Sequence, residues 1–422
     1  MNKLFNLFEK IFTIISFIHY SGGPLLLILS GGVSEGEEGD DATFPLISLI
    51  LIVIYFITFS LLLLRWKKVF SVILRGGSIW LLFGLATCSI IWSYSPELTR
   101  TRVIALIGTL LFSLYFASRY TLKEQLNLLG WVFGIIVVTS LFYCILLPKY
   151  GLMSGIHTGA WRGIYNHKNV LGKIMVLSSV VFLLLAMAAK KHRWIFWNLL
   201  SGSIILLLLS RSSSSLINLL ILVGILLFLH VLFMHILRWN YMLIIPTLIV
   251  ILLFIVILYS FLATSGEQVA GIFGKDLTLT GRTAFWPLIL DKISEKPWLG
   301  YGFGAFWQGL EGPSAYVWNA SAFKAPNSHN GYLDLCLELG LTGLSIYLFK
   351  FVSSVHRAIA LIRSVSTPDA LWPVLLLSYI VLSNLTESSL VLQNNLLWTL
   401  QTSTFLSLYR SPLNKVTDPL LK

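Results

Sequence analysis

Residues 325–340 read APNSHNGYLDLCLELG, so that a polar loop becomes an apolar segment within a few positions. The Pro-Asn pair interrupts regular structure, and Ser328 or Asn330 can accept hydrogen bonds from the free N–H groups of a helix that starts here. We expect that helix to run on through Leu348. The stretch predicts an apolar helix that begins at a polar boundary, with His329 at its N-terminal end.

The same alternation of apolar blocks and polar connections extends along the chain. The 422 residues are 56% hydrophobic and 11% charged, and their mean hydropathy is +0.83, whereas soluble domains carry roughly 25% charged residues. The apolar blocks are about 17–23 residues long, enough for a helix to cross a hydrocarbon core of roughly 30 Å. Barrel strands are about half as long and alternate. We therefore predict an all-α, polytopic integral membrane protein.

Twelve transmembrane helices follow from these blocks. They cover about residues 11–30, 45–64, 77–94, 101–118, 127–147, 170–189, 194–210, 215–235, 241–262, 331–350, 369–386 and 391–409. The first block is too long for a signal peptide and lacks a small-x-small cleavage site, so we expect it to be retained. The long polar stretch predicts one large exterior loop between helices nine and ten. The predicted divisions are 1–262, 263–328 and 329–422.

The distribution of lysine and arginine predicts the orientation. With the N-terminus in the cytoplasm, eighteen of the 30 basic residues lie in cytoplasmic segments, as the positive-inside bias requires. The first exterior loop, 31–44, then carries five acidic residues and no basic one. We therefore predict that both termini are cytoplasmic. Nucleic-acid binding is a poor explanation for the net charge of +12, because the basic residues are scattered over separate loops.

Twelve basic residues fall on the exterior half, against this bias. They are Arg100, Arg102, Lys149, Arg162, Lys168, Lys173, Arg211, Lys275, Arg282, Lys292, Lys296 and Lys324. A cation at a helix end in a membrane must be solvated, snorkelled or paired, and few acids lie nearby. We therefore expect an anionic ligand at the exterior face.

The densest exterior cluster is WRGIYNHKNVLG at residues 161–172, directly before an apolar helix. Its polar members are Arg162, Asn166, His167, Lys168 and Asn169. Its glycines permit close backbone approach, and a helix N-terminus preceded by cations suits a phosphate. We favour this interpretation over a polar connection alone.

Other exterior charges have two explanations each. Arg211 lies in the hydroxyl-rich turn 209–215 with no acid beside it. This favours a role in binding an anion over a surface position without function. Arg100 and Arg102 are expected in the first turn of a helix, where a bound anion and snorkelling to lipid phosphates explain them equally well. Glu387, at the exterior end of the eleventh helix, either pairs with an arginine or contacts a polar substrate, and we favour the structural pairing.

Within the long exterior segment, residues 281–293 have helical period and predict an amphipathic helix that starts near Arg282. Gly300-Tyr-Gly-Phe-Gly304 follows no predicted strand, so we interpret it as an aromatic-lined turn rather than a nucleotide loop. Asp-x-Asp motifs and His/Cys/Asp clusters with ligand spacing do not occur in the exterior loops. We therefore predict neither a metal nor a cofactor. The three cysteines, all within apolar blocks, imply no disulfide framework.

His329 is the candidate proton acceptor. It is expected at a water–membrane boundary, and imidazole ordinarily titrates near neutrality. The simpler interpretation is an interfacial polar residue. Aromatic side chains of the same face, such as Trp161, Tyr165, Trp307 and Tyr332, could stack on sugar rings, although aromatic belts are common in membrane proteins.

Together, these motifs resemble the O-antigen ligase and polymerase superfamily. They are Trp-Arg-Gly-x-Tyr-x-His-Lys-Asn-x-Leu-Gly (161–172), Ser-Arg-Ser (210–212), Leu-Thr-Gly-Arg-Thr (279–283), Pro-Trp-Leu-Gly-Tyr-Gly-Phe-Gly (297–304) and His-Asn-Gly-Tyr-Leu (329–333). Trp-Ser-x-x-Pro (92–96), the arginine pair and Asn-x-Thr-Glu-Ser (384–388) make the chain most similar to the exopolysaccharide polymerases of that group. The resemblance covers about residues 90–410.

The resemblance implies a multi-pass glycosyltransferase of the bacterial inner membrane, with its active site facing the periplasm. It would take glycan from undecaprenyl pyrophosphate and join it to the hydroxyl of a glycan or lipid-linked acceptor. The motifs do not distinguish polymerases from ligases. For this reaction we expect catalysis by His329, as general base, and by Arg211 and Arg282 on the pyrophosphate. The expected substrate-binding residues are Arg162, His167, Lys168, Asn169, Arg100, Arg102, Asn330 and Glu387. Without a metal, direct displacement would invert the anomeric centre.

Two other classes remain alternatives. A transporter of a lipid-linked glycan or small anion would place its polar site near mid-membrane, often on repeated and interrupted helices. This sequence shows no such repeat, and its polar clusters gather at one face. A non-catalytic scaffold would explain the topology but not the exterior arginines.

Overall fold

The computed structural model describes residues 3–32, 44–231, 282–321, 324–365 and 367–410. Their secondary structure is helical apart from one isolated bridge between Leu152 and Trp161, which confirms the predicted all-α class for this part of the chain. The α-helices are α1 (Lys3–Tyr20), α2 (Leu25–Leu29), α3 (Pro45–Leu63), α4 (Trp66–Arg75), α5 (Ile79–Cys88), α6 (Pro96–Arg119), α7 (Leu122–Leu146), α8 (Pro148–Gly151), α9 (Lys168–Ala188), α10 (Arg193–Leu209), α11 (Ser213–Val231), α13 (Arg282–Glu295), α14 (Ala315–Ala320), α15 (Gly331–Ser364), α16 (Trp372–Asn384) and α17 (Leu396–Ser407).

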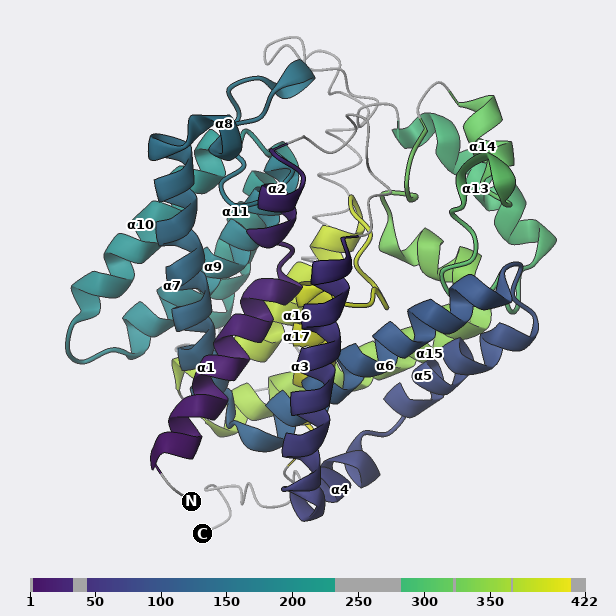
Figure 1. Ribbon diagram of the computed structural model, residues 1–422. Coiled ribbons are helices and arrows are strands. Elements are labelled where there is room, and N and C mark those ends of the chain that lie inside the picture. The colour runs from purple at the N-terminus through teal and green to yellow at the C-terminus, as the bar shows by residue number, and fades with distance from the viewer. Residues whose placement is uncertain (1–2, 33–43, 232–281, 322–323, 366, 411–422) are drawn as a thin grey trace.

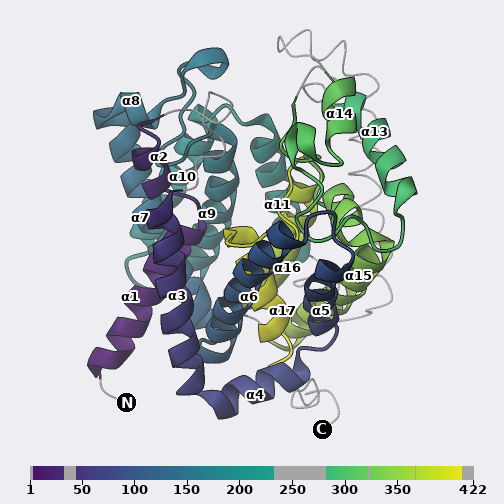
Figure 2. The same ribbon diagram turned by 45° about the vertical axis from the view of Figure 1, so that its right-hand side comes forward.

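The helices form a bundle with two halves (Figures 1 and 2). Helices α7, α9, α10 and α11 pack together in one half, and α5, α6 and α15 lie in the other, with α16 and α17 between them. Helix α9 is the most enclosed of the long apolar helices, because 78% of its apolar window is buried. Trp372 of α16 and Trp398 of α17 are fully buried. The two halves are therefore joined through a common apolar core.

Five described helices, α3, α6, α7, α9 and α15, are long and apolar enough to cross a membrane. A sixth span results if α4 and the segment 79–91, bent by 90° from each other, count as one. Helix α10 and the first part of α11 are apolar but shorter. The predicted ninth span, 241–262, and the predicted exterior residues 263–281 lie outside the described residues. The count of twelve spans thus stays a prediction.

Two predicted boundaries were wrong. The first helix ends at Tyr20 rather than near residue 30, because the chain turns through Gly22 (φ +83°) before the short α2. Helix α6 begins at Pro96, so the two arginines expected in its first turn lie one to two turns further in. Helix α15 runs through Leu348 as predicted and continues to Ser364.

A buried ion cluster ties the N-terminal helices to the bundle. Glu9 of α1 is fully buried; its carboxylate lies 2.7 Å from Arg65 Nη2 and 2.9 Å from Arg119 Nε. A buried carboxylate without partners would be strongly destabilising, and two guanidinium groups offset that penalty. The cluster joins α1 to the corner between α3 and α4 and to the end of α6.

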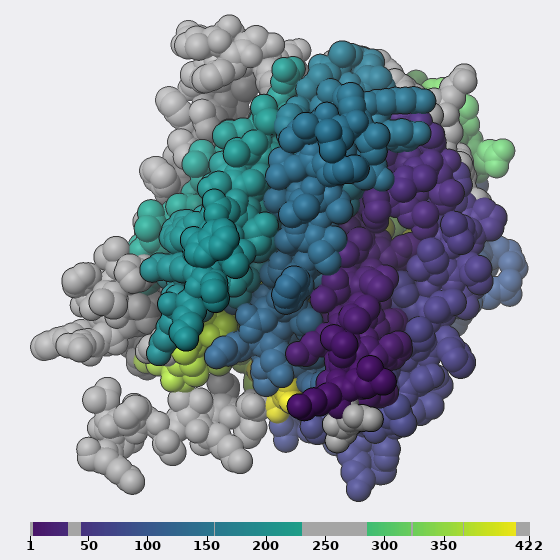
Figure 3. Space-filling view, turned by 60° about the vertical axis from the view of Figure 1, so that its left-hand side comes forward, coloured from purple at the N-terminus to yellow at the C-terminus, as the bar shows by residue number. Residues whose placement is uncertain are grey.

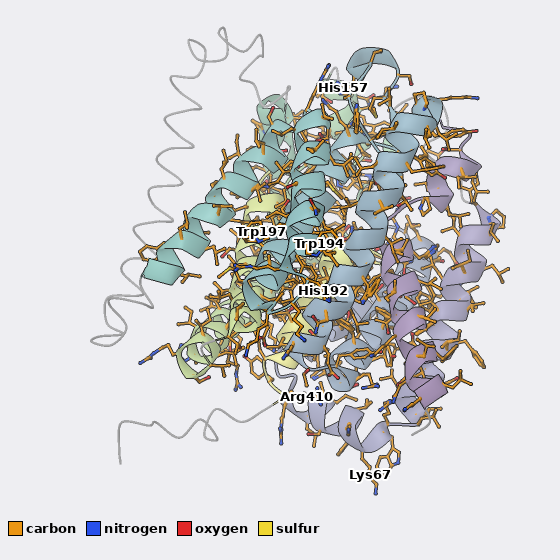
Figure 4. The ribbon with its side chains drawn as sticks, turned by 90° about the vertical axis from the view of Figure 1, so that its left-hand side faces the viewer. Lys67, His157, His192, Trp194, Trp197 and Arg410 are labelled. Atoms are coloured by element: carbon orange, nitrogen blue, oxygen red, sulfur yellow. The ribbon has the colours of Figure 1, made fainter. Side chains whose placement is uncertain are left out.

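The predicted exterior and cytoplasmic segments lie at opposite ends of the molecule. Helices α8, α13 and α14 lie at one end, and α4 at the other (Figure 1). Figure 4 places His157 at the first end and Lys67 at the second, with Arg410 towards the Lys67 end. We call the first of these the α8/α13 end. The arrangement has the two-ended form that the charge distribution requires.

Between these ends the flank of the bundle is apolar. Figure 3 shows the segments of α1, α7 and α10 side by side on one face. On α7, Trp131, Val138 and Ile145 follow one another at two-turn intervals and are 68%, 59% and 64% exposed. Such a row would be costly in water and is favourable against lipid. The flank therefore fits a membrane protein.

Candidate functional site

The segment before α15 holds His329 in a defined position. Asn330 is the N-cap of α15, and its side chain accepts hydrogen bonds from the N–H groups of Tyr332 and Leu333, as predicted for this residue. His329 has a positive φ of 51°, and its own N–H donates to Asn327 Oδ1 at 2.9 Å. The Trp286 indole of α13 donates to the Ser328 carbonyl at 3.0 Å. Helix α13 and the cap of α15 thus support the loop from both sides.

Asp334, one turn into α15, connects three parts of the chain. Its carboxylate accepts hydrogen bonds from the Trp307 indole at 2.8 Å and from the Ser328 N–H at 3.1 Å, and from the hydroxyl of Ser388. Carboxylates make strong hydrogen bonds of this kind. Asp334 therefore fixes the backbone next to His329 against the α16–α17 connection.

The glycine-rich segment 297–304 closes a break in α15. Gly340 departs from helical geometry (φ 66°, ψ −171°), which leaves backbone groups around it without helical partners. The segment supplies them: Tyr301 N–H donates to the Leu337 carbonyl at 2.8 Å, and Leu341 N–H donates to the Pro297 carbonyl at 2.8 Å. A Cβ on Gly340 would lie 2.2 Å from the Trp298 carbonyl carbon. The segment is a packed turn, in keeping with the interpretation that it is no nucleotide loop.

A cavity of about 230 Å³ opens beside this break. It is lined by Arg102, Phe303, Trp307, Pro326, Asn327, Asp334, Glu338, Ser388, Leu390, Val391, Leu392 and Gln393. Arg102 Nη1 donates to the Gly304 carbonyl at 2.5 Å, so the glycine-rich turn positions this guanidinium at the wall. The cavity brings together α6, α15 and the α16–α17 connection.

Asp334 and Glu338 were missed as site residues in the sequence. They lie four residues apart, on one face of a helix that is otherwise apolar. Two carboxylates in such a helix are rare unless they face a polar cavity. That spacing was the available signal. The chain positions that complete the cavity are remote, and no spacing rule connects them.

Arg162 is buried among backbone carbonyl groups. Its side chain is 1% exposed, and its guanidinium donates to the backbone carbonyls of Tyr150 at 2.8 Å, Gly32 at 2.6 Å and Lys149 at 3.3 Å. The guanidinium therefore has partners within the protein, and its predicted contact with substrate stays a prediction. A planar group with five donors can hold several carbonyls at once, and here it organises the loop around α8.

His167 is the N-cap of α9, and its Nδ1 accepts a hydrogen bond from the Asn169 N–H at 3.1 Å. Burial, followed by the positive influence of His157, lowers the pKa of His167 to about 4. Its ring lies 5.8 Å from that of His157, centre to centre. The neutral imidazole therefore caps a helix that begins at Lys168. This environment is the helix N-terminus that the sequence predicted.

Glu387 joins the two predicted loops. Its carboxylate lies 3.5 Å from Lys173 Nζ near the start of α9, and its backbone carbonyl accepts a hydrogen bond from the Gly331 N–H, next to Asn330, at 3.2 Å. Structural pairing, one of its two predicted roles, is thus present, with Lys173 in place of the expected arginine. Through this single residue, the cluster at 161–173 and the His329 segment lie together at the α8/α13 end.

The turn that carries Arg211 lies against the same cluster. Trp161 N–H donates to the Leu209 carbonyl at 3.0 Å, and a Cβ on Gly172 would lie 2.7 Å from Ser215 Oγ. Arg211 itself is exposed and has a positive φ of 53°. The structure therefore brings the loops of Arg162 and Arg211 together, although only the second presents its side chain outward.

The other predicted residues differ in their surroundings. Arg100 is exposed and pairs with Glu97 at 2.7 Å, so it is separated in role from Arg102 at the cavity. Tyr165 is fully buried and is closed to a sugar, whereas Trp307 lines the cavity. Arg282 begins α13, but its side chain lies outside the described part. Among the described residues, groups of three or more His, Cys, Asp or Glu that could hold a metal do not occur.

Two comparisons with known proteins found similar sequences. Residues 197–348 match the family model described as O-antigen ligase. The chain is also 24% identical over 312 residues to the exopolysaccharide production protein ExoQ of Rhizobium meliloti (strain 1021), covering 71% of this chain and 69% of that protein. The matched residues include most of α10, all of α13, the glycine-rich turn, His329, Asp334 and Glu338.

Proposed function

We propose, for this bacterial membrane protein of the O-antigen ligase and polymerase type, that it transfers glycan from an undecaprenyl-pyrophosphate carrier to an acceptor hydroxyl. The reaction would take place at the α8/α13 end, which would face the periplasm. The acceptor hydroxyl would belong to a growing polysaccharide or to a second lipid-linked molecule. The transferred unit is an oligosaccharide in either case.

The observation that supports this proposal is the contact made by Glu387. It joins a basic helix start, with Lys168 and Lys173, to the segment that holds His329. A transferase of this kind needs cations for a departing pyrophosphate and a proton acceptor close by. A binding protein or a transporter does not need the proton acceptor.

The chemistry would use displacement at the anomeric carbon. The acceptor oxygen forms the new glycosidic bond as the bond to the pyrophosphate oxygen breaks, and His329 takes the proton of the acceptor hydroxyl. The pyrophosphate leaves with the bonding electron pair, and lysine and arginine side chains stabilise its charge. We propose Arg211 and Arg282 for this role, together with the lysines of α9. A single displacement inverts the anomeric configuration.

Transfer by the purified protein tests the proposal. The protein in lipid nanodiscs would be given a lipid-linked oligosaccharide, and product length would be followed in the presence of EDTA. We expect glycan transfer, and we expect His329→Ala to reduce turnover by about 10²–10⁴-fold while donor binding is retained. The control is His356→Ala, at the other end of the same helix. Near-normal turnover of His329→Ala would refute the base assignment, and movement of donor across liposomes without transfer would favour the transporter.

A further inference from the structure

We propose that the cavity between Arg102, Asp334 and Glu338 binds one sugar ring of the acceptor glycan. The inference rests on the proposed function and extends it, because it assigns the acceptor a place distinct from that of the pyrophosphate. Four features of the cavity carry it: its size, the chemistry of its walls, its charged groups and its position.

The size fits a single small polar unit. At about 230 Å³, the cavity is smaller than the roughly 300–1,000 Å³ of pockets that hold drug-sized ligands. Its walls come from rigid parts of the bundle: α6, α15 held by the turn 297–304, and the α16–α17 connection. A preformed cavity of this kind binds a small rigid ring with little loss of conformational freedom.

The walls carry the groups that recognise neighbouring hydroxyls. Carboxylates accept two hydrogen bonds side by side, and a guanidinium or a side-chain amide can donate two. Glu338 supplies the carboxylate, Arg102 the guanidinium and Gln393 the amide. Phe303 and Trp307 add aromatic surfaces for the C–H face of a ring. An apolar ligand would leave these polar groups unpaired, which is costly.

The charged groups of the cavity do not suit the pyrophosphate. Among the described residues that line it, Arg102 is the one cation, and it lies with the acidic side chains of Asp334 and Glu338. The other cations lie around the start of α9, where Lys173 meets Glu387. The α8/α13 end therefore has a cavity with few cations and a separate basic region, which suits a neutral sugar in the first and a pyrophosphate in the second.

The position suits an acceptor. Asn327 and Asp334, which flank His329 in the chain, both line the cavity, and Ser388 follows Glu387. Asp334 also holds the Ser328 N–H at 3.1 Å. A ring in the cavity would therefore lie beside the backbone segment that carries His329 and beside the α16–α17 connection that carries Glu387.

Binding and kinetics on the full-length protein in nanodiscs test the inference. The probes are the oligosaccharide released from the lipid-linked donor by mild acid, measured by calorimetry, and inorganic pyrophosphate as an inhibitor of transfer. The variants are Glu338→Gln on α15 and Gln393→Ala on the α16–α17 connection, with Glu311→Gln, at an exposed position outside the cavity, as the control. Monodisperse elution confirms that each variant is folded.

We expect Glu338→Gln to weaken oligosaccharide binding and to raise the KM for acceptor by about tenfold or more, as for loss of a charged hydrogen bond. Gln393→Ala should act in the same direction, and pyrophosphate inhibition should not change. Unchanged oligosaccharide binding in both cavity variants, with transfer intact in the unaltered protein, would overturn the inference alone. Weakened pyrophosphate inhibition would also overturn it. Oligosaccharide binding that depends on Glu338 in a protein without transfer would refute the proposed function and leave a sugar site.

Discussion

At the scale of single residues, Arg162 shows that a positive charge in an exterior loop can have a structural role. Its guanidinium holds the carbonyls of Tyr150, Gly32 and Lys149, and a lysine cannot reach all three. We expect Arg162→Lys to lower the free energy of unfolding by about 1–3 kcal/mol, the cost of carbonyls left unsatisfied. Thermal unfolding of the purified variant would show a reduced Tm. Arg211→Lys, at an exposed position, is the control. A normal Tm together with weakened donor binding would instead assign Arg162 to the substrate.

His167 makes stability depend on pH. Burial lowers its pKa from 6.5 to about 4, so between these values the unfolded chain binds a proton that the folded protein does not. The contribution of neutral His167 is complete above pH 6.5 and decreases as the pH falls towards 4. The loss is at most about 3 kcal/mol, because His167 is partly exposed.

The variant His167→Asn checks this dependence, because asparagine also caps a helix but does not titrate. We expect the Tm of the unaltered protein to fall more steeply than that of His167→Asn between pH 6.5 and 4.5. Parallel curves for the two proteins would contradict the assignment. The difference between the curves isolates the histidine from carboxylates that titrate in the same range.

At the scale of elements, the break in α15 depends on Gly340. Its φ of 66° and the closeness of the Trp298 carbonyl leave no room for a side chain. We expect Gly340→Ala to destabilise the protein by more than about 1–3 kcal/mol, the usual cost of a strained backbone, and to weaken oligosaccharide binding because the turn 297–304 positions Arg102. Gly84→Ala, in α5 with open space around its Cβ, should keep or slightly raise the Tm. Equal Tm values for Gly340→Ala and the unaltered protein would show that the backbone at the break accommodates a side chain.

At the scale of the whole molecule, the two ends should lie on opposite sides of the membrane. We expect a cysteine at position 157 to be labelled by an impermeant maleimide from the periplasm, and a cysteine at position 67 only after the membrane is opened. The physical reason is the asymmetric distribution of basic residues, and Figure 4 shows both positions at opposite ends. The background is Cys88→Ser, since Cys144 and Cys336 are buried. Labelling of position 67 from outside would reverse the orientation.

Local features were predictable because they depend on neighbours in the chain. Long apolar blocks require helices in a membrane, and the side chain of Asn330 needs only the next turn of its own helix to cap it. The amphipathic pattern of 281–293 similarly predicted α13. The two ends of the molecule were predictable for the same reason, because that prediction compares the lysine and arginine content of successive connections.

By itself, then, the sequence determined the helical class, the α15 cap and the grouping of polar motifs at one end. Only the tertiary structure decided which charges are available, because that depends on groups far apart in the chain. Arg162 is enclosed by carbonyls of other segments, and Glu387 meets Lys173 across two helices. Asp334 and Glu338 line a cavity whose other walls include Arg102, more than two hundred positions earlier in the sequence, and the segment from Ser388 to Gln393, fifty or more positions later. A charge in a linear sequence shows only its own type; burial and partners, which set its energy, are properties of the fold.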